Sequence, residues 1–226
     1  MKTSKAAVLT FLLLVAISSF SLSADPIYPL DRTEVNSFDR LTMQPYNKTL
    51  DVAGDITSIV SMATPAIFLA LPSSEYLNVG VMYAETLALT YGTSVLLKSV
   101  VNRERPYMYF DGYPEKEVES GDSSKSFPSR HTAMAFASAA FSSYVFSKYY
   151  PDSEWRIPVI AVSYSIAAAT AALRIASGNH FATDVLTGAL VGTVIGFGIP
   201  ALHTLLADEN VEASASPFGL VFKVSL

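Results

Sequence analysis

The chain has 226 residues, of which 50% are hydrophobic and 15% are charged, and its formal net charge is −5. A soluble domain typically carries about 25% charged residues, so this deficit points to a membrane or to an unusually apolar interior. The acidic balance and the lack of any Lys/Arg run argue against a nucleic-acid partner. Because cysteine is absent, disulfides, thiolate chemistry, cysteine-bound metals and lipid attachment through cysteine are excluded.

Residues 1–24 have the organisation of a secretory signal peptide. Two lysines precede a 15-residue apolar run from Ala6 to Phe20, and the small residues Ser23 and Ala24 follow where a peptidase would cut. The run is short for a membrane span, which needs about 20 residues. We predict a cleaved signal, with an uncleaved first span as the alternative; either way, the next segment leaves the cytoplasm.

The remaining chain divides into a polar segment, an apolar region and a short tail. Residues 25–56 are polar, show no clear period and could hold one short helix, whereas residues 207–226 form the tail. Between them, at 57–206, we predict helices because Ala, Leu, Met and Phe dominate and Gly and Pro lie mostly outside the apolar stretches. The stretches are Thr57–Leu71, Tyr76–Leu97, His131–Ser147, Ile157–Leu173 and Val185–Leu206.

These stretches lack the charged face that a surface helix of a soluble protein shows. Their lengths of 15 to 22 residues lie around the threshold for crossing a membrane. We therefore predict an all-α bundle of about five long apolar helices, embedded in a membrane. A soluble all-α protein with buried helices remains the alternative, because the third and fourth stretches are rich in Ser and Ala.

A row of small and polar residues begins the fifth stretch. His180, Asp184, Gly188, Gly192 and Gly196 are spaced four apart, so on a helix they share one face. Glycines at this spacing allow a second helix to approach closely. The face would point the His–Asp pair into the bundle, although the glycines could equally serve packing alone.

Two cations lie at the end of the second stretch. Lys98 and Arg105 are seven residues apart, close to two helical turns, and Pro106 marks the expected helix end. Such a pair suits a phosphate group, but an interfacial anchor would also explain it.

A second cluster opens the third stretch. Ser129 is a natural N-cap, and the free backbone N–H groups that follow it form an anion site. His131 would lie beside a bound anion, although a capped helix can carry a histidine incidentally.

The third cluster joins the fourth stretch to the fifth. After Arg174, residues 177–179 interrupt the helical pattern, and Asn179 is the expected N-cap of the next helix. His180 and Asp184 can then hydrogen-bond, which fixes the imidazole tautomer and leaves the other nitrogen free to attack. A lone His–Asp pair is more often structural. His203, near the end of the fifth stretch, has no evident partner, and we interpret it as structural.

In chain order the clusters read Lys-x6-Arg-Pro, Pro-Ser-x-His and Arg-x5-His-x3-Asp, between Lys98 and Asp184. This order resembles the tripartite signature of the type 2 phosphatidic acid phosphatase and vanadium haloperoxidase superfamily. The sequence departs from the family pattern at Arg130, where Gly is usual, and at Leu173, where Ser is usual. Arg130 either adds a charge to the phosphate site or points away and offers only its N–H. Neither departure removes a residue that does chemistry, so we expect activity, with substrate preference and efficiency left open.

The resemblance implies a phosphatase that needs neither a metal nor another cofactor, because protein cations do the work of Mg²⁺. His180 is the expected nucleophile, oriented by Asp184, and His131 is expected to protonate the leaving oxygen and later to activate water. The expected phosphate-binding residues are Lys98, Arg105, Ser129, Arg130 and Arg174.

Two expected spans separate the second cluster from the third, so both lie on one membrane side, which is periplasmic if counted from the signal. A phospholipid, a polyprenyl diphosphate or a lipid A phosphate would fit the site, and the oligomeric state stays open. A soluble periplasmic acid phosphatase of the same superfamily is the main alternative. A vanadate-dependent haloperoxidase and an inactive membrane-binding module are the weaker ones.

Overall fold

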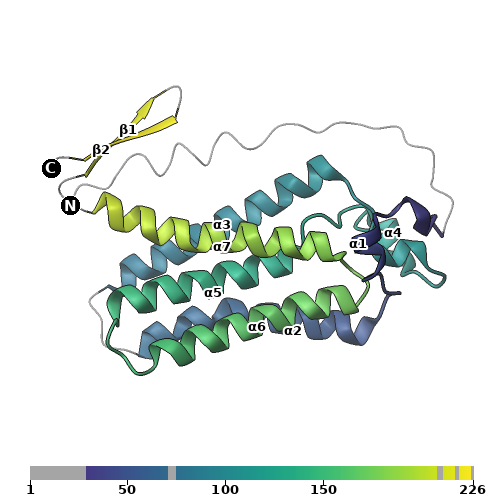
Figure 1. Ribbon diagram of the computed structural model, residues 1–226, viewed down its shortest axis with the longest axis horizontal. Coiled ribbons are helices and arrows are strands. Elements are labelled where there is room, and N and C mark those ends of the chain that lie inside the picture. The colour runs from purple at the N-terminus through teal and green to yellow at the C-terminus, as the bar shows by residue number, and fades with distance from the viewer. Residues whose placement is uncertain (1–28, 71–74, 208–210, 217–218, 225–226) are drawn as a thin grey trace.

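The computed structural model describes residues 29–70, 75–207, 211–216 and 219–224. The predicted signal at 1–24 lies outside these residues. Five long helices of the described residues pack side by side, and the short helices α1 and α4 gather at one end of the bundle (Figure 1). The long helices are α2 (Lys48–Ala63), α3 (Tyr76–Val101), α5 (Arg130–Tyr149), α6 (Arg156–Ala176) and α7 (Ala182–Leu206); the short ones are α1 (Ser37–Arg40) and α4 (Glu115–Glu119).

Short 3-10 turns and one hairpin complete the described chain. The turns are η2 (Arg32–Glu34), η3 (Thr64–Ala70) and η4 (Pro106–Tyr109). Strands β1 (Val211–Ser216) and β2 (Gly219–Val224) pair antiparallel, with Val211 opposite Val224. The prediction of an all-α bundle is confirmed, and the tail adds a hairpin that the sequence pattern did not predict.

Helix α5 is the central element, and α2, α3, α6 and α7 all pack against it. Its buried positions are mostly Ala and Ser, with the larger Phe141 and Phe146 toward its end. Small side chains let several helices approach one axis closely. The Ser/Ala-rich composition, which kept a soluble fold open, therefore reflects the central place of this helix.

The predicted glycine face is confirmed as the contact between α7 and α5. A Cβ atom on Gly188 would lie 2.5 Å from the carbonyl oxygen of Ser129, and one on Gly192 would overlap the carbonyl oxygen of Ala133. Gly196 makes the same approach one turn further along. Because α5 begins at the second cluster and α7 follows the third, this contact fixes the distance between the two.

We expect Gly192→Ala to destabilise the protein by about 2 kcal/mol, because the added methyl group collides with the backbone of α5. Gly198 is the matched control, since it lies on the same helix and a Cβ there meets nothing within 4 Å. Gly198→Ala should be neutral or stabilising by up to about 1 kcal/mol, the helix-propensity difference. Thermal unfolding in detergent measures both. Equal stability of the two variants would contradict the close contact.

The first stretch is α-helical only to Ala63 and continues as the 3-10 turn η3, and three further predicted helix boundaries are wrong, each for a local reason. Helix α2 begins at Lys48 rather than Thr57, because Asn47 caps it by accepting from the backbone N–H of Leu50. Helix α3 ends at Val101, since Asn102 adopts a left-handed conformation (φ 45°). The third boundary, at the start of α7, concerns the site and is described below.

Three helical segments among the described residues are long and apolar enough to cross a membrane: Lys48–Leu69, Arg156–Ala176 and Ala182–Leu206. Their outward faces are apolar. On α7, for example, Leu186, Leu190 and Val194 are each about 60% exposed. A bundle that presents such a surface suits a lipid surrounding, as the sequence predicted.

Candidate active site

The three sequence clusters meet at one end of the bundle, the end at which Figure 1 places α1 and α4. The end of α3, the start of α5 and the link between α6 and α7 all lie there. Hydrogen bonds join the clusters directly. Lys98 Nζ donates to the carbonyl oxygen of Ser126, at 3.4 Å, and Arg105 Nη1 donates to Asn179 Oδ1, at 3.0 Å.

Arg105 reaches the site from a loop, not from the helix that carries Lys98. Because α3 ends at Val101, the predicted common helical face is wrong, although Arg105 is extended as expected before a proline (φ −78°, ψ 154°). Its guanidinium forms an ion pair with Asp122 and its Nε donates to the Asp122 carbonyl oxygen, at 3.0 Å. These contacts aim the buried cation at the link between α6 and α7.

His180 is buried, with 1% of its surface exposed, and it precedes α7 instead of lying on it. The N-cap of α7 is Phe181, so the predicted cap at Asn179 is wrong: the Asn179 side chain instead binds Arg105 and Asp51. The His180 backbone N–H donates to the Arg174 carbonyl oxygen, at 3.2 Å, which holds the residue in place.

The predicted hydrogen bond between His180 and Asp184 is absent. His180 Nδ1 lies 3.8 Å from Asp184 Oδ2 and has no partner among the residues that the structure describes. The reason is that Asp184 serves other donors. Its Oδ2 accepts from Ser126 Oγ (2.5 Å) and from the Phe181 backbone N–H (2.9 Å), while Oδ1 accepts from Arg103 Nη1 (2.6 Å).

Electrostatics favour the neutral form of His180. Burial lowers the pKa of its imidazole well below the ordinary value, and the positive charges of Arg105, Lys98 and Arg174 lower it further. A neutral imidazole keeps a free lone pair, so His180 is in the form that can act as a nucleophile.

His131 has a carboxylate neighbour that is distant from it in the sequence. Its Nε2 lies 3.3 Å from Asp55 Oδ1, on α2, and about a third of the side chain (31%) is exposed. Burial and the positive charges of Arg174, Arg130, Arg105 and Lys98 lower the pKa of His131 to about 3, and the Asp55 carboxylate opposes this shift. The two histidines share the same cations and differ in burial and in their carboxylate neighbour: His180 is enclosed, whereas His131 is partly exposed and lies beside Asp55.

The same carboxylate contacts Arg174, which is 3% exposed at the end of α6. Arg174 Nη1 donates to Asp51 Oδ1 (2.6 Å) and to Asp55 Oδ1 (3.0 Å), whereas the buried Nε has no partner among the described residues. Gly54 makes room for this contact, because a Cβ there would lie 3.0 Å from Arg174 Cδ. Helix α2 thus supplies the carboxylates that fix both Arg174 and His131.

At the start of α5, the prediction that Ser129 is the N-cap is confirmed. Ser129 Oγ accepts from the backbone N–H of Thr132 (3.5 Å) and from its hydroxyl (2.9 Å). The guanidinium of Arg130 lies 5.1 Å from the ring centroid of Tyr91, on α3. Arg130 therefore stacks on a neighbouring helix while its backbone forms the first turn of α5.

Sequence reasoning missed several site residues: Asp39, Asp51, Asp55, Arg103, Asp122, Ser126 and Asn179. Arg103 lies inside the first cluster and could have been weighed with Lys98 and Arg105. Asp51 and Asp55 are four residues apart on α2, a spacing that hints at one helical face. Asp39 carried no signal, because nothing local in its polar segment shows which distant groups it contacts.

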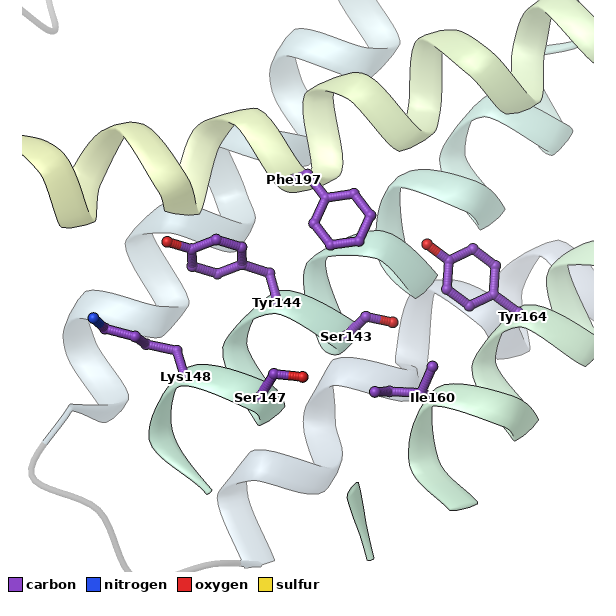
Figure 2. Close-up of a pocket in the computed structure, with 7 residues that line it drawn as sticks. All are labelled: Ser143, Tyr144, Ser147, Lys148, Ile160, Tyr164 and Phe197. Carbon is purple, nitrogen blue, oxygen red and sulfur yellow. The ribbon is translucent and has the colours of Figure 1, made fainter. Parts of the chain in front are cut away.

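The other end of α5 carries a cavity of about 520 Å³ (Figure 2). It is lined by Ser143, Tyr144, Ser147, Lys148, Ile160, Tyr164 and Phe197. No histidine or carboxylate lines it, and Figure 2 shows the Lys148 side chain extending away from the other lining residues. None of the residues of the three clusters lines this cavity.

His203, for which the sequence shows no evident partner, pairs with a carboxylate on α3. Its Nε2 lies 2.6 Å from Glu85 Oε2, on α3, and both side chains are more than a third exposed. His203 lies in the last turn of α7, far from the start of that helix, and so it is separate from the site.

The comparisons with known proteins agree with the geometry. The sequence model of the PAP2 superfamily matches residues 79–207. Over 76 residues the chain is 38% identical to the lipid A 1-phosphatase of Porphyromonas gingivalis; the alignment covers 34% of this chain and 16% of that protein, so the chain spans only a small part of this curated relative.

Two solved structures are similar to this chain at low sequence identity. Aquifex aeolicus LpxE has a TM-score of 0.49 and 24% identity, over 72% of this chain and 92% of that one. A PAP2-type phosphatidylglycerolphosphate phosphatase from Bacillus subtilis has a TM-score of 0.43 and 23% identity, over 72% and 90%. The PAP2 match covers more than half of the chain and includes all three clusters from Lys98 to Asp184, and the chain therefore belongs to the PAP2 superfamily.

Proposed function

We propose that this protein is a metal-independent phosphatase that hydrolyses a phosphate monoester or diphosphate of a membrane lipid through a phosphohistidine on His180. One observation carries the proposal. A buried histidine, whose pKa is lowered well below its ordinary value, lies within the electrostatic reach of Arg105, Arg174 and Lys98, with a second histidine beside them; burial and Arg105 lower the pKa of Lys98 to about 7. Phosphoryl transfer depends mostly on positioning and on stabilising negative charge, and such a cage supplies both.

The chemistry begins with the substrate phosphoryl group bound by the cations and by the N–H groups at the start of α5. Nε2 of His180 attacks phosphorus in line, the bond to the leaving oxygen breaks, and His131 gives that oxygen a proton. Water then attacks the phosphohistidine while His131 takes up its proton. Inorganic phosphate leaves, and His180 returns to its neutral form.

Asp55 has a defined place in this cycle. Its carboxylate bridges His131 and Arg174, with 49% of the side chain exposed. A carboxylate beside His131 stabilises the imidazolium that serves as the acid. Because Asp55 also binds Arg174, an incoming phosphate must share that guanidinium with the carboxylate.

The lipid substrate and the location rest on separate support. The lipid A 1-phosphatase relative is named for a lipid phosphate, and three helices of this chain could cross a membrane. We infer a lipid phosphate of the same general class, a membrane location and a site on the periplasmic side, where the predicted N-terminal signal would direct the chain.

The test is a phosphate-release panel with the purified full chain in detergent and EDTA. The substrates are phosphatidic acid, a polyprenyl diphosphate, a lipid A phosphate and p-nitrophenyl phosphate. We expect at least one lipid to be hydrolysed at full rate in EDTA, and vanadate to inhibit because it mimics the transferring phosphoryl group. Loss of activity in EDTA that Mg²⁺ restores would refute the metal-free mechanism. Hydrolysis of p-nitrophenyl phosphate alone, without need for detergent, would favour a soluble acid phosphatase.

A further inference from the structure

Arg103 is a further arginine near the site, and its guanidinium is held by two buried carboxylates. Nη1 donates to Asp184 Oδ1 at 2.6 Å, and Nη2 donates to Asp39 Oδ2 at 2.7 Å. Both carboxylate side chains have no exposed surface, whereas that of Arg103 is 23% exposed. Nη1 also donates to Thr183 Oγ1, at 2.8 Å, and the guanidinium carbon lies 4.0 Å from the ring centroid of Phe181.

Asp39 is anchored as firmly as Asp184. Its Oδ1 accepts from the Thr183 backbone N–H (2.9 Å), which is a free donor in the first turn of α7, and its Oδ2 accepts from the Thr183 hydroxyl (2.6 Å). Asn36 donates to Oδ2 as well, at 2.7 Å. Burial alone would raise the pKa of Asp39, but hydrogen bonds from Arg103 and Thr183 hold it below its ordinary value. Asp39 is therefore a fixed anion that holds Arg103.

This arrangement separates Arg103 from the cations of the phosphate site. Both hydrogens of Nη1 are used by Thr183 and Asp184, and Nη2 is directed to Asp39. A guanidinium that bridges two buried carboxylates neutralises charge that would otherwise be unpaired in the interior. Lysine could not reproduce the bridge, because its ammonium lacks the planar fork.

We propose that Arg103, held in place by Asp39, is a positioning residue that keeps Asp184 ionised and oriented toward His180 and that takes no part in binding phosphate. The inference rests on the proposed function of His180 as nucleophile. As Nε2 attacks phosphorus, positive charge grows on the ring, and the nearest carboxylate oxygen is Asp184 Oδ2, 3.8 Å from Nδ1. A carboxylate fixed there stabilises the charged ring only while it stays ionised.

The segment before residue 79, where the family match begins, has a defined role in this proposal. Asp39 lies on α1, outside the matched residues 79–207. Through Asp39, that segment both caps the start of α7 and fixes the charge pair behind the nucleophile. The PAP2 portion of the chain thus takes one of its positioning groups from outside itself.

The experiment compares Arg103→Met, Arg103→Lys and Asp39→Asn with the wild type in the full chain. We expect kcat to fall by about 10–100-fold in Arg103→Met, as for groups that orient a reactive residue, with KM and the inhibition constant of inorganic phosphate unchanged. Arg103→Lys should recover part of the loss, and Asp39→Asn should reduce kcat in the same way. The matched control is Arg32→Met, since Arg32 also stacks on a ring, 3.9 Å from the centroid of Phe110, but binds no carboxylate of the site.

A rise in KM and in the phosphate inhibition constant with kcat unchanged would make Arg103 a phosphate ligand and overturn the inference, as would wild-type kinetics in Arg103→Met. If Arg103→Met does not fold, Arg103→Lys replaces it in the test, because lysine keeps the positive charge but cannot bridge the two carboxylates. In that variant a lower kcat with unchanged KM supports positioning, whereas a higher KM with unchanged kcat contradicts it. Removing Arg103 in an Asp184→Asn background should cost little, since the two act as one unit; a full additional loss would also contradict positioning. Absence of phosphatase activity in the wild type would instead remove the proposed function.

Discussion

Replacing His180 with alanine is expected to lower kcat by about 10⁴-fold or more on every substrate, because the variant has no nucleophile to accept the phosphoryl group. Burial and the surrounding cations lower the pKa of His180 well below its ordinary value, and its side chain is the more deeply buried of the two site histidines, 2% exposed against 31% for His131. Steady-state phosphate release from a lipid phosphate and from p-nitrophenyl phosphate measures the loss.

The matched control is His203→Ala. His203 lies on α7 near its last turn and pairs with Glu85, at 2.6 Å, away from the site. It should leave kcat unchanged, which separates the loss of one particular histidine from the general effect of removing an imidazole. Acid-labile phosphoenzyme should be trapped in the wild type and in His203→Ala. Trapping it in His180→Ala would place the nucleophile elsewhere.

The sequence alone predicted that the three clusters meet, because each cluster lies at or next to the end of a helix. Ser129 is the cap it was predicted to be, and the spacing of Gly188, Gly192 and Gly196 predicted the face on which α7 meets α5. Both are local or periodic features. A cap depends on a few neighbouring residues, and a face depends on a period of about four, so each can be inferred without knowing the fold.

The errors arise where a contact depends on residues distant in sequence. The spacing of His180 and Asp184 predicts a hydrogen bond, but Ser126 and Arg103 already occupy the carboxylate, and neither is a local neighbour. Asn179 has the side chain of an N-cap, yet Arg105 and Asp51 bind it instead. Competition among partners for one polar group is decided by tertiary structure.

The acidic residues of the N-terminal part show the same limit. Asp39, Asp51 and Asp55 are ordinary polar positions in the sequence, whereas in the fold Asp39 pairs with the partly buried Arg103, and Asp51 and Asp55 pair with the buried Arg174. A buried arginine needs a compensating anion. The sequence therefore implies that such partners exist, but it does not say which carboxylates serve.

The comparison of His131→Ala on two leaving groups tests the division of labour between the histidines. An acid matters most when the leaving oxygen is basic, so the variant should lose about 10²–10⁴-fold in kcat on an alkyl phosphate and much less on p-nitrophenyl phosphate. Asp55 strengthens this expectation. Its carboxylate lies 3.3 Å from Nε2 of His131 and opposes the lowering of the His131 pKa by burial and the site cations, whereas the Asp184 carboxylate near His180 is 3.8 Å away and accepts from other donors.

Asp55→Asn is the companion variant, because it keeps the shape of the side chain and removes its charge. It should follow the same pattern as His131→Ala with a smaller loss, since His131 remains but is less readily protonated. Both variants keep His180 and should still form phosphoenzyme from p-nitrophenyl phosphate. Equal losses of His131→Ala on the two substrates, together with phosphoenzyme in His180→Ala, would mean that the roles are reversed: the histidine beside Asp55 would be the nucleophile, and the buried one the proton donor.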